Sequence, residues 1–220
     1  MNWDAIFFDL DGTLVQTSPE IADAVNDALT ACGHPTVAQD DVDRWIGHGT
    51  RELLIQALAK VSGQDAAQVR HSALLGEALP VFDRCYQARC GTRSHLYPHV
   101  RETLARLRER GCRLAVVTNK EGRYTDTVLR VHGLLEAFDL VVSGDTLPTR
   151  KPDPAGVLLG LRQWQVDPAR ALFVGDSSID AATARRAGLA VWLLPYGYNM
   201  GAPVQDCRPD RVINDFSELL

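Results

Sequence analysis

The feature that most constrains the fold is a series of short apolar runs separated by polar segments. The runs are rich in Val, Ile, Leu and Phe and lack apolar–polar alternation. Strands that are buried on both faces of a parallel sheet have this pattern. The runs cover residues 5–8, 114–117, 140–142, 171–174 and 189–194. We therefore predict a parallel sheet with helices on both faces.

Helical patterns separate the later runs. Residues 100–107 place apolar side chains at i, i+4 and i+7, and Gly111 follows as a stop signal. Two further helices are predicted within residues 153–164 and 177–188. Strands and helices thus alternate from about residue 96 to residue 194. This alternation predicts an α/β fold with a Rossmann-like open parallel sheet core and right-handed crossovers.

The stretch between the first two runs is different. Residues 16–93 contain helical patterns, including 51–60 and 65–90, but no convincing strand. We expect the second of these helices to break near Pro80. The length of the stretch suits a small domain. We therefore predict an α/β core domain formed by residues 1–15 and 94–220, and an all-helical domain formed by residues 16–93, inserted after the first strand.

Composition excludes several classes of protein. The 220 residues carry a formal net charge of −5, which argues against nucleic acid or an anionic membrane as the main partner. The apolar runs are far shorter than the roughly 20 residues of a membrane span. Five irregularly spaced cysteines fit a reducing compartment, and the first residues do not resemble a signal peptide. We expect a cytoplasmic monomer or homodimer.

Polar residues follow the apolar runs where the predicted strands end. In an open α/β sheet, ligands bind beyond the carboxyl ends of the strands, so these side chains should converge on one place. Crowded carboxylates need a cation, and oxygen ligands without His or Cys favour Mg²⁺. Hydroxyl, amide and ammonium groups nearby would bind an anion. The residues are Asp9, Asp11, Thr118, Asn119, Lys151 and Asp176.

This combination suits phosphoryl transfer, in which positioning and charge stabilisation dominate catalysis. Asp9 and Asp11 are two apart, so both can face the same side of an extended chain, and Gly12 lets the chain turn afterwards. One carboxylate can attack phosphorus, while the other protonates the leaving alcohol and later deprotonates water. A calcium loop is disfavoured because Gly12 directly follows the second Asp and the later ligands are missing.

Four motifs in order resemble those of the haloacid dehalogenase superfamily, and the resemblance covers nearly the whole chain. The inserted helical stretch resembles the type 1 cap of that superfamily, which closes over the substrate. The motifs are Asp9-Leu10-Asp11-Gly12-Thr13-Leu14, Val117-Thr118-Asn119, Lys151-Pro152-Asp153-Pro154 and Gly175-Asp176-Ser177-Ser178-Ile179-Asp180.

The resemblance implies a role for each motif residue. Asp9 would be the nucleophile and Asp11 the general acid and base. Mg²⁺ would be held by Asp9, the Asp11 backbone carbonyl and Asp176, with Asp180 supporting the metal from nearby. Phosphate binding is implied for Gly12, Thr118, Asn119 and Lys151.

Within the superfamily, the chain is similar to bacterial phosphoglycolate phosphatases. The similarity rests on residues 45–49, 96–98, 116–120 and 196–199. It implies Mg²⁺-dependent hydrolysis of a small phosphate monoester, 2-phosphoglycolate, through an aspartyl-phosphate. The chain departs from the common pattern at two positions, Gln16 and His99.

The inserted domain offers candidates for contacting the substrate. Near Gly47, the side chains of His48 and Arg51 are candidates to reach the carboxylate of 2-phosphoglycolate. The alternative is an exposed helix start capped by Thr50.

Two other functions stay open at this stage. One is a broad-specificity sugar-phosphate or nucleotide phosphatase of the same superfamily. The other is a non-catalytic protein that binds a phosphorylated ligand on the same fold.

Overall fold

The computed structural model describes residues 3–220. Its main sheet is parallel throughout, with strand order β5-β4-β1-β6-β7-β8. The strands are β1 (Ala5–Phe8), β4 (Arg113–Val117), β5 (Leu140–Val142), β6 (Ala171–Gly175), β7 (Ala190–Leu193) and β8 (Arg211–Val212). The five predicted apolar runs are all strands. The edge strand β8 was not predicted, because two residues are too few to show a pattern.

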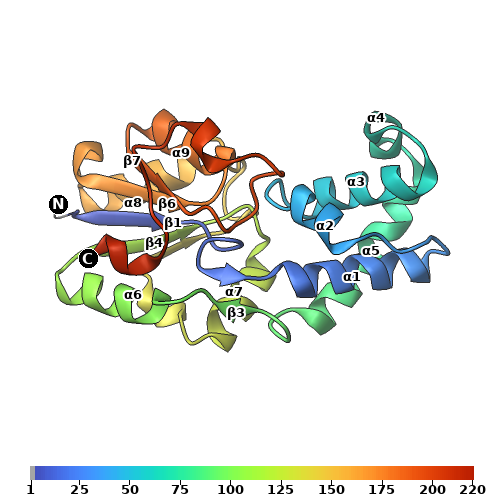
Figure 1. The fold of residues 1–220 in the computed structure, drawn as a ribbon, viewed down its shortest axis with the longest axis horizontal. Helices are drawn as coiled ribbons and strands as arrows, with labels where there is room; N and C mark the ends of the chain where they lie inside the picture. The colour runs from blue at the N-terminus through green and yellow to red at the C-terminus, as the bar shows by residue number, and fades with distance from the viewer. Residues whose placement is uncertain (1–2) are drawn as a thin grey trace.

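Both faces of the sheet are buried, which explains the unbroken apolar runs. Ile6 and Phe8 of β1 contact one apolar cluster, whereas Ala5 and Phe7 contact another. The first cluster lies under α6 (Val100–Glu109) and α7 (Gly122–Val131), and the second under α8 (Ala155–Trp164) and α9 (Ser178–Ala187) (Figure 1). Of these four helices, α7 was not identified from the sequence. Four short 3₁₀ helices cover Leu135–Ala137, Pro168–Arg170, Val204–Cys207 and Phe216–Leu219.

The inserted helices lie beyond one end of the sheet (Figure 1). They are α1 (Ser18–Ala31), α2 (Gln39–Trp45), α3 (Thr50–Ser62), α4 (Ala66–Arg70) and α5 (Ala73–Arg89). The two segments that connect the inserted helices to the sheet pair with each other as an antiparallel ladder. They are β2 (Val15–Gln16) and β3 (His95–Leu96). The prediction of no strand in residues 16–93 is therefore wrong at Gln16, because this ladder depends on a partner about 80 positions away rather than on local pattern.

The predicted helix break near Pro80 is also wrong. Pro80 lies inside α5, and the chain instead breaks between α4 and α5, at His71 and Ser72. A proline inside a helix costs about 3 kcal/mol. Here Leu75, Phe82 and other residues on both sides of Pro80 are buried, and burying large side chains of this kind stabilises by about 1.5–3 kcal/mol each. The packing of α5 therefore outweighs the local penalty.

Glu20 of α1 joins the start of the inserted segment to its end. This side chain is buried and accepts three backbone N–H groups. The donors are Gly91 at 3.0 Å, Arg93 at 3.2 Å and Ser94 at 3.0 Å. A buried carboxylate is costly unless it is hydrogen-bonded, so these bonds hold the returning chain against α1.

None of the helices formed by residues 3–220 is long and apolar enough to span a lipid bilayer. All five cysteines are free thiols.

We expect Glu20→Ala to lower the free energy of unfolding by about 2–3 kcal/mol, because it leaves partly buried amide groups unpaired. Urea unfolding followed by circular dichroism measures the change. Asp23→Ala on the same helix is the matched control. Among residues 3–220, Asp23 pairs with Arg89 and Arg93 alone, whose side chains are half-exposed, and such pairs contribute about 1 kcal/mol or less. Equal losses in the two variants would contradict the role of Glu20.

Candidate active site

The predicted polar residues converge where three neighbouring strands end. Asp9 and Asp11 follow β1, Thr118 and Asn119 follow β4, and Asp176 follows β6. All five line one cavity of about 50 Å³ between the sheet and the inserted helices. The adjacency of β4, β1 and β6 in the sheet places these side chains together, as expected for the carboxyl ends of parallel strands.

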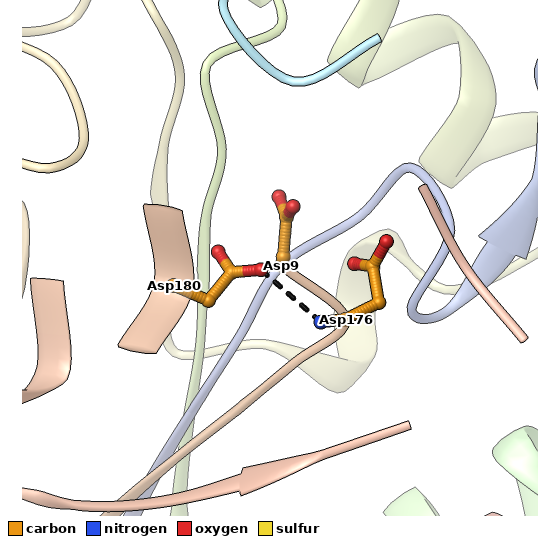
Figure 2. Close-up of side chains that lie close together, drawn as sticks. All are labelled: Asp9, Asp176 and Asp180. Atoms are coloured by element: carbon orange, nitrogen blue, oxygen red, sulfur yellow. Dashed lines mark hydrogen bonds between the residues drawn. The ribbon is translucent and has the colours of Figure 1, made fainter. Parts of the chain in front are cut away.

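Three buried carboxylates form the floor of the site (Figure 2). Oxygen atoms of Asp9, Asp176 and Asp180 lie within 4.8 Å of one another. Burial raises the pKa of Asp9 to about 6, although the nearby Lys151 ammonium opposes the shift. Burial, together with the charges of Asp180 and Asp9, raises the pKa of Asp176 well above its usual value. A cation would relieve this repulsion, and an all-oxygen donor set fits Mg²⁺.

Lys151 lies between two of these carboxylates. Its Nζ atom is 2.8 Å from Asp9 Oδ1 and 2.7 Å from Asp180 Oδ1. The neighbouring acids raise the pKa of Lys151 despite its burial, so the lysine is charged. Lys151 therefore neutralises part of the negative charge of the floor and fixes the position of Asp9.

Asp180 is held by the start of α9. Its Oδ2 atom accepts the backbone N–H groups of Asp176 and Ser177, each at 3.1 Å, and Figure 2 shows the first of these bonds. Ser177 caps the helix: its side chain accepts the backbone N–H of Asp180, and the Asp180 side chain accepts the backbone N–H of Ser177. This capping box satisfies two free N–H groups at the helix start. The sequence suggested Asp180 as a support for the metal, and the structure adds its direct contact with Lys151.

Lys120 is a site residue that sequence reasoning missed. Its Nζ atom lies 3.1 and 3.2 Å from the two carboxylate oxygens of Asp11, and it donates to the Tyr86 hydroxyl at 2.5 Å. Thr17 also donates to Asp11, at 2.7 Å. Lys120 is only 6% exposed. The available signal was its place directly after Thr118-Asn119, at the end of a buried strand.

Two glycines make room for Asp176. A β-carbon at Gly12 would lie 2.4 Å from Asp176 Oδ2, and one at Gly197 would lie 2.2 Å from the same atom. Gly12 also has a positive φ of 84°, which favours glycine. The amide of Gly12, expected to bind phosphate, donates to the Val15 carbonyl at 2.9 Å. In this structure, Gly12 therefore serves the turn and the space beside Asp176.

Asn119 connects the core to the inserted helices. Its side-chain amide donates to the Gly47 carbonyl at 2.9 Å and to the Lys151 carbonyl at 3.0 Å. The other side-chain atom, Oδ1, is the buried polar side-chain atom that finds no partner within residues 3–220. Because a buried acceptor is costly to leave unpaired, this atom is available to a donor from a ligand or water in the cavity.

The structure places His48 and Arg51 away from the cavity. His48 lines a separate surface pocket, and the Arg51 guanidinium donates to the Arg70 carbonyl at 3.2 Å. The alternative of a helix start capped by Thr50 is also wrong: Gly49 precedes the helix, and the Thr50 hydroxyl donates to Glu121 at 2.7 Å. The Glu121 carboxylate takes this hydroxyl from the helix start, because charge-assisted hydrogen bonds are stronger than neutral ones.

The regions that match known proteins include both the sheet and the inserted helices. A family model described as haloacid dehalogenase-like hydrolase matches residues 3–188. The phosphoglycolate phosphatase of Vibrio cholerae is 38% identical over 98% of this chain and 94% of its own length. That of Pseudomonas putida is 40% identical, covering 98% of this chain and 78% of its own length.

A solved structure has the same arrangement of elements. The crystal structure of a predicted phosphoglycolate phosphatase from Haemophilus somnus 129PT superimposes with a TM-score of 0.92 at 34% identity. The match covers 100% of this chain and 97% of the Haemophilus chain.

We expect Gly197→Ala to lower the free energy of unfolding by about 1–3 kcal/mol, because the added methyl group overlaps the buried Asp176 carboxylate. Gly76→Ala is the matched control: no atom outside its own helix lies within 4 Å of the added β-carbon, and alanine favours a helix. Thermal unfolding of both variants measures the effect. A Gly197→Ala protein as stable as the wild type would contradict the close approach to Asp176.

Proposed function

This chain belongs to the haloacid dehalogenase-like hydrolases, and from that premise we propose that it is a Mg²⁺-dependent phosphatase that hydrolyses 2-phosphoglycolate to glycolate and phosphate. The observation that carries the proposal is the pairing of Asp9 and Asp11 in one small cavity. Asp9 lies beside Lys151 and the acidic cluster, whereas Asp11 lies beside Lys120 on the other side. The two carboxylates therefore have different surroundings, as two different chemical roles require.

In the proposed reaction, an Asp9 carboxylate oxygen attacks phosphorus while the bond from phosphorus to the ester oxygen breaks. Asp11 gives its proton to that oxygen, so glycolate leaves as an alcohol. Asp11 then takes a proton from water, whose oxygen attacks phosphorus while the bond from phosphorus to the Asp9 oxygen breaks. Phosphate is released, and both side chains return to their starting states.

Charged and polar groups around Asp9 would stabilise the transferred phosphoryl group. Thr118 is buried beside the cavity, and its hydroxyl oxygen accepts the backbone N–H of Lys120 at 3.3 Å, which leaves the hydroxyl hydrogen for a phosphate oxygen. Lys151 would act beside it, and Asn119, whose side-chain amide donates to the Gly47 and Lys151 carbonyls, would hold the Lys151 backbone in place. Mg²⁺, held by Asp9, the Asp11 backbone carbonyl and Asp176, would supply positive charge against the phosphoryl oxygens.

The position of the cavity supports a small ester over the alternatives. The cavity is lined on one side by the ends of the sheet and on the other by the inserted helices, which favours a small, enclosed ester over a nucleotide or a large sugar phosphate. The names of the relatives from Vibrio and Pseudomonas support 2-phosphoglycolate. The intact carboxylate pair argues against a binding protein without catalysis.

We also propose that residues 16–93 act as a cap domain on a core formed by residues 1–15 and 94–220. The support is that α3 and α5 contribute Thr50, Leu53 and Tyr86 to the cavity wall. Cytoplasmic location and a monomeric or dimeric state stay predictions.

Asp9→Asn should lower kcat for 2-phosphoglycolate by at least about 10³-fold, because the amide is a poor nucleophile. Phosphate release with Mg²⁺ and with EDTA measures the loss, and EDTA should abolish turnover by the wild type. Asp23→Asn, on an outer face of α1, is the control and should keep full activity. Substantial turnover by a pure Asp9→Asn protein would remove Asp9 as the nucleophile.

Mg²⁺ should stabilise the protein more at pH 7.5 than at pH 5. Burial raises the pKa of Asp9 to about 6 in the folded metal-free protein, above its unfolded value of about 3.9. The stability that protonation of Asp9 contributes is therefore fully present below the unfolded pKa and is lost as the pH rises through about 6. A bound cation offsets this loss and competes with the proton. The measurement is the shift in Tm on adding Mg²⁺ to EDTA-treated protein. A shift that is independent of pH would count against Mg²⁺ at Asp9.

A further inference from the structure

We propose that Lys120, together with the Tyr86 hydroxyl, binds the carboxylate of the substrate and so selects 2-phosphoglycolate over phosphate esters that lack a carboxylate. This inference rests on the function proposed above. It assigns substrate selection to one residue of the core and one of the inserted helix α5, rather than to His48 or Arg51.

The first argument is the distribution of charge. Among residues 3–220, Lys120 is the one cationic side chain that lines the cavity. Lys151 lies just outside that wall and is held between Asp9 and Asp180. A substrate with a phosphate and a carboxylate brings two anionic groups to different places. Lys151 and the metal site serve the phosphate end, so Lys120, which also pairs with Asp11, is the cation that faces the other end.

The second argument is position. Asp11 must lie beside the ester oxygen if it gives that oxygen its proton. In 2-phosphoglycolate, a single methylene group separates the ester oxygen from the carboxylate. Lys120 Nζ lies 3.1 Å from Asp11 Oδ1, so a carboxylate one carbon beyond the ester oxygen falls within reach of the ammonium group. Phosphate esters without a carboxylate would leave this cation without a partner on the ligand.

The third argument is the pairing of donors. A lysine ammonium has three N–H donors, and its contact with Tyr86 uses the phenol oxygen as the acceptor. The phenol hydrogen therefore remains a donor, with the Cys90 side chain as its partner in the protein and a ligand carboxylate as the stronger acceptor. Burial raises the pKa of Tyr86 well above its usual value, so the hydroxyl keeps that hydrogen. An ammonium and a neutral hydroxyl side by side form a suitable carboxylate site.

The Tyr86 ring is held rigidly for this role. It is 2% exposed, and its centroid lies 5.5 Å from that of Phe82 and 4.5 Å from that of Tyr124. Phe82 also lines the cavity. Packing against both rings fixes the hydroxyl position before a ligand arrives, which reduces the entropy cost of binding.

The test compares Lys120→Met with the wild type on two esters, 2-phosphoglycolate and ethyl phosphate. Ethyl phosphate has the same O–CH₂ link but a methyl group in place of the carboxylate. We expect the ratio of kcat/KM for 2-phosphoglycolate to that for ethyl phosphate to fall roughly 10- to 150-fold, the range for losing a hydrogen bond to a charged group. Lys60→Met is the control, since Lys60 is an exposed lysine on α3, and it should leave the ratio unchanged.

A purely positioning role for Lys120 predicts a different result. If Lys120 only orients Asp11, Lys120→Met lowers kcat/KM for both esters by the same factor, and the unchanged ratio overturns the proposal. If Lys120→Met does not fold, Tyr86→Phe replaces it, because this change keeps the buried ring. The ratio should then fall by roughly 3- to 10-fold, in line with the loss of a neutral hydrogen bond, and an unchanged ratio again overturns the proposal.

The outcome is separable from the proposed function. If the wild type hydrolyses other phosphate esters but not 2-phosphoglycolate, the proposed substrate is wrong. If the wild type prefers 2-phosphoglycolate and Lys120→Met keeps the same preference, the proposed substrate stands and the carboxylate site is wrong.

Discussion

The ion pairs of Lys151 with Asp9 and Asp180 are the interaction on which the site depends. Three carboxylates at the buried end of a sheet repel one another, and without a fixed cation the folded state would have to bind protons instead. Lys151 supplies one such charge permanently, and the capping box at Ser177 orients Asp180 to receive it. The first turn of α9 thereby controls, through Lys151, the position of Asp9 directly after β1. Removing one member of a buried ion network is costly because the others lose their compensation.

Much of this architecture was predictable because local pattern and global environment agree. Strands buried on both faces must be continuously apolar, so β1, β4, β5, β6 and β7 were visible in the sequence. The convergence of Asp9, Thr118 and Asp176 followed from the rule that parallel strands present their carboxyl ends at one edge. The four motifs then added the family resemblance that the comparisons support.

What sequence reasoning missed depends on partners distant in the chain. The β2–β3 ladder has two residues on each side, which is too short for a periodic signal. Pro80 was expected to end a helix by local preference, but the buried residues around it override that preference. Lys120 has no diagnostic spacing, since its role arises from Asp11 and from Tyr86, which lies on a different structural unit. The orientation of Arg51, which bonds to Arg70, is equally invisible before the fold is known.

The β2–β3 ladder pairs Val15 with Leu96 and Gln16 with His95, and so brings both ends of the insertion together at one point. The inserted chain therefore leaves the main sheet and returns to it through one narrow stalk. The proposed nucleophile and metal ligands lie on one side of this stalk, while Tyr86 and the rest of the inserted wall lie on the other. In evolutionary terms, the inserted part of the substrate site can diverge without the reaction, because replacing the insertion leaves the hydrogen-bond register of the main sheet untouched.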